Sequence, residues 1–254
     1  MKTNIRYILL TALRDWLFAG LLLGVVLVVM ISGALGDMAM VEPLQLRISY
    51  AAAACRLVLV VGMIVFVCFH VRSAFDTKEI DVFLSRPISR PNLVLSYWLG
   101  FTVAAMLLVV PTVAIMAWVG FLNQQGFMAW ALTLALEIVL VVAVALFSSF
   151  TLKSAVSSVM GSLGFYVMSR MMGFFIATSH SALLFRDKDL SHLSQLLMKY
   201  LAIIVPRLDF FAKTNWLVYG LESMQDLWYP LIQAAIFIPL LLAATMVDFR
   251  RKQF

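Results

Sequence analysis

Six long apolar runs are the feature that most limits what this chain can fold into. They cover residues 17–36, 50–70, 95–119, 128–150, 154–177 and 228–247. At about 20 residues or more, each is long enough for an α-helix that crosses about 30 Å of hydrocarbon. A chain of 254 residues that is 63% hydrophobic and 13% charged cannot cover so much apolar surface with polar side chains. We therefore predict an all-α integral membrane protein, a single domain over residues 1–254 with six transmembrane helices.

The sequence also excludes several other classes of protein. With Gly 12, Pro 7 and Cys 2, it is neither collagen-like, disordered nor a disulfide-rich scaffold. It has no Gly-Lys-Ser/Thr phosphate loop, no nucleophile-elbow serine and no Cys/His cluster at zinc spacing. We therefore predict that the chain has no catalytic residues and binds no metal or cofactor, and that any ATP use belongs to another chain.

The net charge of +6 is distributed as membrane topology requires, and not as nucleic-acid binding would require. With both termini in the cytoplasm, the cytoplasmic segments hold eleven Lys and Arg in about 50 residues, and the outer segments six in about 70. The eleven are Lys2, Arg6, Arg14, Arg72, Lys78, Arg86, Arg90, Lys153, Arg250, Arg251 and Lys252. This difference predicts a multi-pass protein with both termini cytoplasmic.

Residues 1–16, before the first apolar run, predict a short helix on the cytoplasmic membrane surface. Apolar side chains share an arc of about 100° on such a helix, namely those of Ile5, Ile8, Leu9, Ala12 and Trp16. The basic side chains lie away from this arc, as in interfacial helices. The alternative is that the segment simply extends the first membrane span.

Residues 179–227 form an outer loop of about 49 residues, which is too long for a passive connection. An amphipathic helix is predicted within it, with an apolar face made by Leu190, Leu193, Leu197, Tyr200, Leu201 and Ile204. An aromatic belt at the membrane surface is predicted to follow, formed by Trp216, Tyr219, Trp228 and Tyr229.

Residues 71–94 form a charged cytoplasmic loop between the second and third spans. A helix is predicted from Ser73, as N-cap, to Leu84, with Pro87 ending it. Phe75, Glu79 and Val82 would lie on one side of this helix.

Three ionisable residues lie inside predicted spans, where each costs about 2.5–3.5 kcal/mol. They are Arg56, Glu137 and Arg170. Counted from the outer ends of their helices, they lie about 9, 14 and 9 Å deep, so that an Arg–Glu–Arg cluster can form in the outer half. Two interpretations stay open: a polar lining for a substrate path, and a structural ion pair between helices.

The cytoplasmic loop also carries a pattern that resembles a known family. The stretch from Phe75 to Arg90, FDTKEIDVFLSRPISR, is similar to a segment of bacterial ABC transporter permeases of the type-2 exporter class. In those permeases an acidic residue precedes Leu-Leu-Ser-Arg-Pro-Val/Ile-Ser-Arg, which here corresponds to Glu79 and the residues from Phe83 to Arg90. The stretch Val205–Asp209, VPRLD, resembles the Leu-Pro-x-Leu-Asp that precedes the sixth span in some of these permeases.

The resemblance implies a dimeric permease in the bacterial cytoplasmic (inner) membrane, made of two copies or two related chains. Two separate ATPase subunits would bind ATP and Mg, and membrane lipids would surround the complex. The helix at residues 73–84 would be the coupling helix. The resemblance also implies that this helix contacts the ATPase through Phe75, Asp76, Glu79 and Asp81. Arg86 and Arg90 would place the loop at the anionic inner leaflet. The alternative is a solvated basic loop that only obeys the positive-inside rule.

Three functions are therefore compatible with the sequence. The first is the permease subunit of an ATP-driven exporter. The second is an ABC-type mechanotransmission or assembly subunit that acts on an outer partner without transport. The third is an ion-coupled secondary transporter that uses Glu137.

Overall fold

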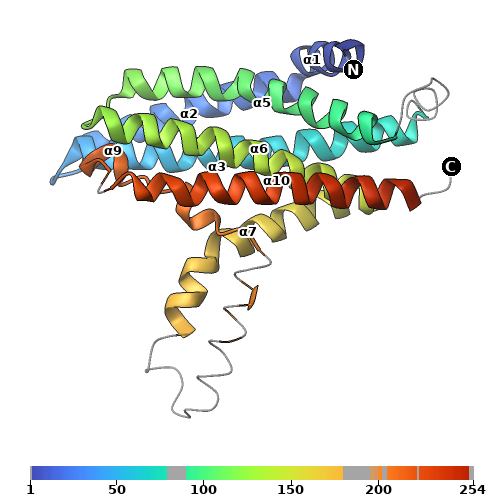
Figure 1. The fold of residues 1–254 in the computed structure, drawn as a ribbon. Coiled ribbons are helices and arrows are strands. Elements are labelled where there is room, and N and C mark those ends of the chain that lie inside the picture. Colours follow the sequence, from blue (N-terminus) through green and yellow to red (C-terminus); the bar gives the residue numbers. More distant parts are fainter. Residues whose placement is uncertain are drawn as a thin grey trace.

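Long helices make up most of the part of the chain that the structure describes (Figure 1). The structure is a computed structural model, and it describes residues 2–78, 90–179, 196, 198, 200–201, 205–221 and 223–251, with side chains from residue 8 onward. The helices are α1 (Lys2–Arg14), α2 (Trp16–Met38), α3 (Pro43–Asp76), α5 (Arg90–Val119), α6 (Gln124–Thr151), α7 (Ala155–Ser179), the 3-10 helix η1 (Leu208–Phe211), α9 (Trp216–Tyr219) and α10 (Gln225–Arg251).

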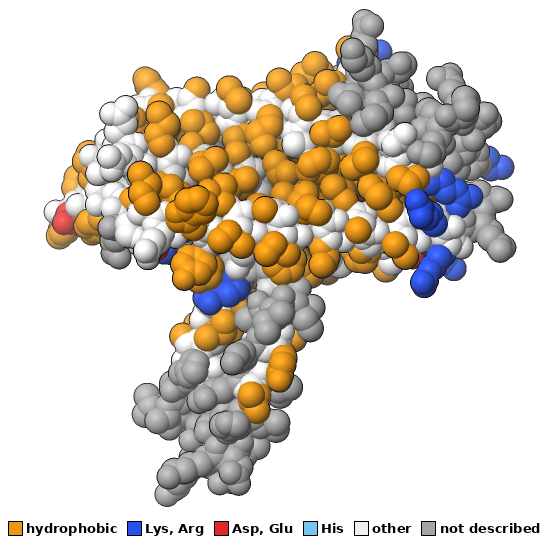
Figure 2. All heavy atoms as spheres, viewed as in Figure 1, with side chains coloured by type: hydrophobic (Ala, Val, Ile, Leu, Met, Phe, Trp, Pro, Cys, Tyr) orange, Lys and Arg blue, Asp and Glu red, His pale blue; other side chains and the backbone are white. Residues whose placement is uncertain are grey.

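Within these described residues, six helices are long and apolar enough to cross a membrane, namely α2, α3, α5, α6, α7 and α10. Each coincides with one of the predicted apolar runs, which confirms the prediction of an all-helical fold with six such helices. Figure 2 shows hydrophobic side chains spread along the flank of the bundle, where a soluble protein would carry charge.

Helix α3 extends much further than the predicted span of residues 50–70. Its 34 residues correspond to a length of about 51 Å, against about 30 Å of hydrocarbon. The predicted helix start at Ser73 is wrong, because residues 71–76 continue α3 and the Ser73 carbonyl accepts hydrogen bonds from the backbone N–H and the hydroxyl of Thr77, at 2.9 and 2.8 Å. The helix ends where Lys78 adopts a left-handed φ of 58°. The rest of the predicted coupling helix lies outside the described residues.

Helices α3 and α6 form the centre of the bundle. Helix α3 packs against α2, α5, α6 and α7. Helix α6 packs against α10 in addition to α3. Large side chains on these helices are fully buried, among them Phe66 of α3 and Trp130 and Phe150 of α6. The other spanning helices surround this pair. Helix α7 runs beside the bundle in its first half and then bends away from it (Figure 1).

The bundle has two chemically different ends. The end that we call the basic end carries both chain termini and the two flanks of the α3–α5 connection (Figure 1). Its described basic residues include Arg72, Lys78, Arg90, Lys153, Arg250 and Arg251. The opposite end carries the α2–α3 and α5–α6 connections and residues 205–221. This arrangement agrees with both termini on one side of a membrane; that this side is the cytoplasm stays a prediction.

Helix α1 lies across the direction of the bundle, so that Figure 1 shows it along its axis. Ile8 and Ala12 are buried, and Ile8 contacts the position of Gly100 on α5. Asp15 separates α1 from α2, since its carboxylate accepts the Leu17 N–H at 3.0 Å and caps α2. Trp16 therefore belongs to α2 and is 90% exposed, so its predicted place on the apolar face of the first helix is wrong.

Residues 205–221 fold back onto the bundle. Helix η1 packs against α6, α7 and α10, and the short α9 packs against α3 and α6. Trp216 is buried there, so its predicted place in an exposed aromatic belt is wrong, whereas Tyr219, Trp228 and Tyr229 are exposed. The predicted amphipathic helix at residues 190–204 lies almost wholly outside the described residues.

Candidate functional site

A buried ion pair joins the two central helices, near the middle of α6. The Nη1 of Arg56, on α3, donates to Oε2 of Glu137, on α6. The two side chains are 1% and 0% exposed. An Arg and a Glu inside a membrane-spanning bundle are each costly alone, and pairing removes most of that cost. The structure thus brings together two of the three intramembrane charges singled out in the sequence.

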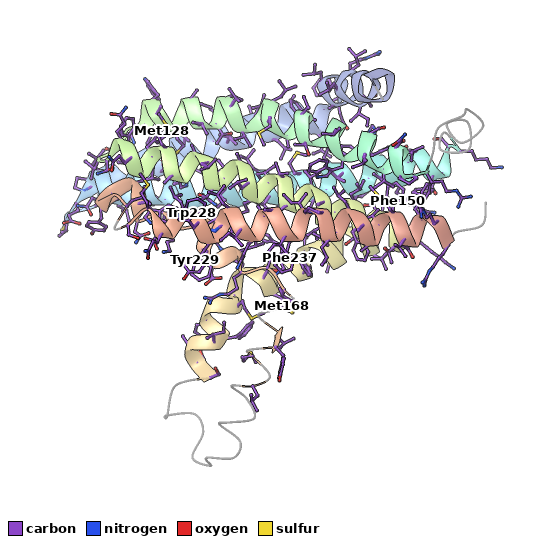
Figure 3. The ribbon with its side chains drawn as sticks, viewed as in Figure 1. Met128, Phe150, Met168, Trp228, Tyr229 and Phe237 are labelled. Atoms are coloured by element: carbon purple, nitrogen blue, oxygen red, sulfur yellow. The ribbon has the colours of Figure 1, made fainter. Side chains whose placement is uncertain are left out.

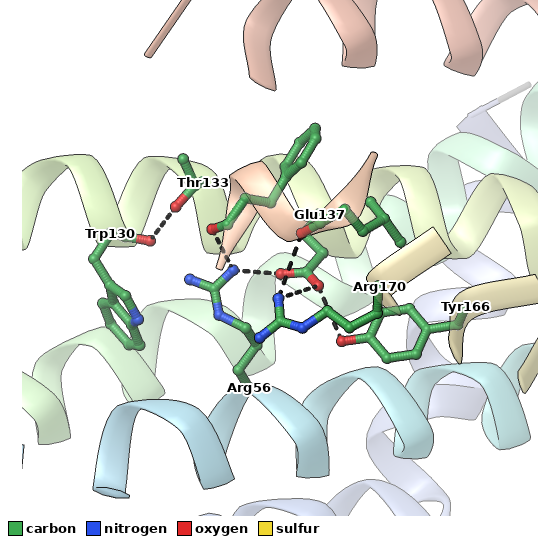
Figure 4. A network of polar contacts seen from close by, with 8 residues as sticks. Arg56, Trp130, Thr133, Glu137, Tyr166 and Arg170 are labelled. Carbon is green, nitrogen blue, oxygen red and sulfur yellow. Dashed lines mark hydrogen bonds and ion pairs between the residues drawn. The ribbon is translucent and has the colours of Figure 1, made fainter. Parts of the chain in front are cut away.

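The other oxygen of Glu137 faces helix α7 (Figure 4). The hydroxyl of Tyr166 donates to Oε1 at 3.0 Å, and Nη1 of Arg170 lies 4.0 Å from the same oxygen. Tyr166 and Arg170 are four residues apart, so they share one face of α7. The third intramembrane charge therefore joins the cluster at its edge. We call Arg56, Glu137, Tyr166 and Arg170 the polar network.

The polar network also holds the returning segment 205–221. Arg56 Nη1 donates to the carbonyl of Phe211 at 2.7 Å, and Arg170 Nη1 to the carbonyl of Leu208 at 3.4 Å. Both carbonyls belong to η1. Two side chains from different spanning helices thus satisfy backbone acceptors of a segment that lies between α7 and α10, and they fix it to the bundle.

Two glycines allow this segment to approach closely. A Cβ on Gly126 of α6 would lie 1.7 Å from the backbone oxygen of Trp216. A Cβ on Gly173 of α7 would lie 2.4 Å from Oδ2 of Asp209. A side chain at Gly126 would push the segment away from α6, because the contact is with backbone, whereas one at Gly173 would require the Asp209 side chain to move.

Buried hydrogen-bond donors in the network and beside it lack an acceptor within the described protein. Nε and Nη2 of Arg56 and Nε1 of Trp130 are buried and have no partner within the described protein. The guanidinium lies 5.7 Å from the centroid of the Trp130 ring, which favours a cation in that place. Buried donors of this kind are commonly satisfied by water or by a ligand.

The charge of the region is also unbalanced. Arg207 binds Asp209 at 2.8 Å beside the network. Among the described residues of the network, η1 and its N-cap Arg207, three guanidinium groups (Arg56, Arg170, Arg207) therefore face two carboxylates (Glu137, Asp209). The region carries one positive charge in excess, and this charge attracts an anion.

At the basic end, the described coupling residues divide into an anchored and an exposed group. The Phe75 ring packs edge-on against Phe150 of α6, with centroids 5.4 Å apart. Asp76 is 61% exposed and pairs with Arg72 at 3.0 Å. The predicted contact residues Glu79, Asp81 and Arg86 lie outside the described residues.

Arg90, predicted to face the inner leaflet, contacts the last turn of α10. Its Nη1 donates to the carbonyls of Phe249 and Arg250 at 3.2 and 3.1 Å, and its guanidinium lies 5.8 Å from the centroid of the Phe249 ring. A cation at a helix C-terminus stabilises the otherwise unpaired carbonyls. Phe249 also packs edge-on against Phe150. Both flanks of the connection between α3 and α5 are thus joined to one aromatic cluster (Phe75, Tyr97, Phe150, Phe249; labelled in part in Figure 3).

Sequence reasoning missed several members of the site. Tyr166 lies in an apolar run, and only its i, i+4 spacing to Arg170 could have pointed to it. The carbonyls of Leu208 and Phe211 have no sequence signal. Among the described residues, no three His, Cys, Asp or Glu side chains lie close enough together to bind a metal ion.

Neither a scan against protein-family models nor a search of curated proteins finds a match to this chain.

Proposed function

We propose that this chain is the membrane permease subunit of an ATP-driven exporter of the ABC type. It would work with separate ATPase subunits and a second permease copy, in the bacterial cytoplasmic membrane. The observation that carries the proposal is the segment from Phe75 to Arg90, whose sequence resembles that of type-2 permeases and which is borne by the overlong helix α3.

The way this segment is attached supports a role in transmitting force. Its first flank is the end of α3, with Phe75 against α6, and its second flank is Arg90 against the last turn of α10. A push on a segment held at both ends would move several helices at once. A solvated loop that served only topology would need neither contact.

Motion begun at the basic end would reach the polar network through α3 and α6. These helices carry the aromatic cluster at the basic end and the Arg56–Glu137 pair near the middle of α6. A shift between them would strain the ion pair and its bond to the Phe211 carbonyl. Residues 205–221 would then move with the bundle, as a cap over the exit of a substrate path.

This last step also supports the second candidate, a mechanotransmission subunit. Because Arg56 and Arg170 hold η1 directly, the same motion can act on an outer partner with no substrate crossing. Reconstitution in liposomes separates the two candidates. ATPase activity with flux of a substrate supports the exporter, and activity without any flux supports mechanotransmission.

An ion-coupled transporter is the third candidate. Glu137 would have to release both Arg56 and Tyr166 to bind an ion or a proton. A Glu137→Gln variant that folds and transports normally would exclude this function and a substrate-lining role for Glu137.

The proposal is tested by purifying the tagged chain from its native membrane and identifying the proteins that accompany it. We expect an ATPase with Walker motifs and a second permease chain. Glu79→Lys should remove most of the ATPase from the complex, whereas Asp37→Lys, the same kind of change on an exposed residue at the opposite end, should leave it bound. A chain that purifies with no ATPase would overturn the proposal.

A further inference from the structure

A groove of about 360 Å³ lies between the last two turns of α6 and α10, at the basic end of the bundle. Phe147 and Thr151, four residues apart on α6, line one side of it. The other side is a face of α10, formed by Ala244, Val247, Asp248 and Arg251. The two helices pack against each other and both run toward the basic end, so the groove lies where they end (Figure 1).

The depth of this groove in a membrane follows from the two apolar runs that the helices contain. The run on α10 ends at Val247, so Asp248 and Arg251 lie about 1.5 and 6 Å beyond it along the helix. The run on α6 ends at residue 150, and Thr151 follows it directly. Phe147 and Val247 therefore lie at the edge of the hydrocarbon, and Asp248 and Arg251 lie at the level of the lipid headgroups.

The polar part of the groove offers two opposite charges. Asp248 and Arg251 are three residues apart and share one face of α10. Arg251 is exposed and makes no hydrogen bond or ion pair within the part of the chain that the structure describes. Asp248 has other contacts in the chain, but a carboxylate accepts several hydrogen bonds, so a further donor can join them. Thr151 is the last residue of α6, whose carbonyl end also favours a cation.

We propose that this groove binds phosphatidylethanolamine, with the ammonium group at Asp248, the phosphate at Arg251 and an acyl chain along Phe147 and Val247. A primary ammonium group donates three N–H bonds, whereas the quaternary ammonium of phosphatidylcholine has no N–H for the carboxylate. The planar guanidinium donates to phosphate oxygens in a bidentate manner. A phospholipid is the occupant that combines both charges at headgroup level with apolar chains where the groove is apolar. This site does not depend on the proposed export function.

Native mass spectrometry of the full chain tests the site, with phosphatidylethanolamine and phosphatidylcholine of the same acyl chains added at equal concentration. We expect phosphatidylethanolamine to be retained about fivefold better, the upper range for an ion pair that water reaches. Asp248→Asn should abolish this preference. Arg251→Gln should lower the retention of both lipids and keep the preference, because both lipids carry the phosphate. Lys153→Gln, which removes a basic charge at the same end but outside the groove, should change neither measurement.

Two further arms keep the test decisive. Phosphoethanolamine, which carries the headgroup without acyl chains, should not displace the lipid; full displacement would show a water-soluble ligand and overturn the proposal. If Asp248→Asn does not fold, a photo-reactive residue at Val247 should cross-link phosphatidylethanolamine better than phosphatidylcholine, whereas one at the exposed Ile236 of α10 should cross-link both equally. Equal retention of the two lipids, an unchanged preference in Asp248→Asn, or full retention in Arg251→Gln would also overturn it.

Discussion

The middle of the bundle and its basic end hold their charges in opposite ways. At the polar network, Arg56 and Glu137 are buried and bound to each other. At the basic end, Asp76 is exposed, and the flanks of the connection are held by aromatic rings and by Arg90 at helix carbonyls. A buried pair determines stability because each partner needs the other, whereas an exposed charge is nearly free to serve a second protein. Mutations in these two regions should therefore affect different measurements.

The largest loss of stability is expected from Glu137→Ala, because it leaves the Arg56 guanidinium buried without its carboxylate. Removal of one partner from a buried pair costs about 3–5 kcal/mol. Equilibrium unfolding of the purified protein in mixed detergent measures the loss. Asp37→Ala, on an exposed carboxylate of α2, is the control and should change the unfolding free energy by less than about 0.5 kcal/mol.

The double variant Arg56→Met, Glu137→Leu sharpens this prediction. Apolar replacement of a whole buried pair is often neutral or stabilising, so we expect it to recover most of the stability lost in Glu137→Ala. A double variant as unstable as the single one would mean that the bond from Arg56 to the Phe211 carbonyl, which only the double variant loses, contributes as much stability as removal of the unpaired charge restores.

The next largest effect is expected from Gly126→Ala, which places a Cβ 1.7 Å from the Trp216 carbonyl oxygen. The clash with backbone should displace α9 from α6 and cost about 1–3 kcal/mol. Gly164→Ala is the matched control, because no atom lies within 4 Å of its new Cβ; it should stabilise α7 by up to about 1 kcal/mol. Proteolysis of residues 205–221 and unfolding in detergent report the two effects. Equal stability of the two variants would show that this segment is not docked on α6.

A smaller effect is expected from Arg90→Gln, which weakens the contact with the last turn of α10. A cation at a helix C-terminus contributes about 0.3–1 kcal/mol at an accessible site. Hydrogen exchange of the last α10 residues should become faster, with little change elsewhere. Lys153→Gln removes an exposed charge at the same end and should leave that exchange unaltered; acceleration in both variants would indicate a general charge effect and no specific cap.

The sequence predicted the six helices because a run of 20 apolar residues has few alternatives to a membrane span. It singled out Arg56, Glu137 and Arg170 because charge inside such a run is costly. It did not predict the continuation of α3 to Asp76, since the charged residues after His70 look like a loop although a helix outside the hydrocarbon tolerates them.

The rest of the site depends on how a long segment returns to the bundle. Arg56 and the Phe211 carbonyl are 155 positions apart in the chain, and no periodicity relates them. The roles of Gly126 and Gly173 follow from the same packing. Local sequence patterns cannot encode such contacts, because any residue offers a carbonyl and a glycine is also common in turns.

Asp76→Ala should have the smallest effect on stability but a large effect on coupling to the ATPase. Its exposed pair with Arg72 is of the i, i+4 type and contributes about 0.3–0.5 kcal/mol, so the unfolding free energy should hardly change. Under the proposed function, Asp76 faces the ATPase, and its loss should lower the ATP hydrolysis that the permease stimulates in the reconstituted complex. Asp37→Ala, also exposed but at the opposite end, should affect neither measurement. If Asp76→Ala keeps full ATPase stimulation while Glu79→Lys abolishes it, the contact lies further along the connection, and Asp76 serves only to end α3.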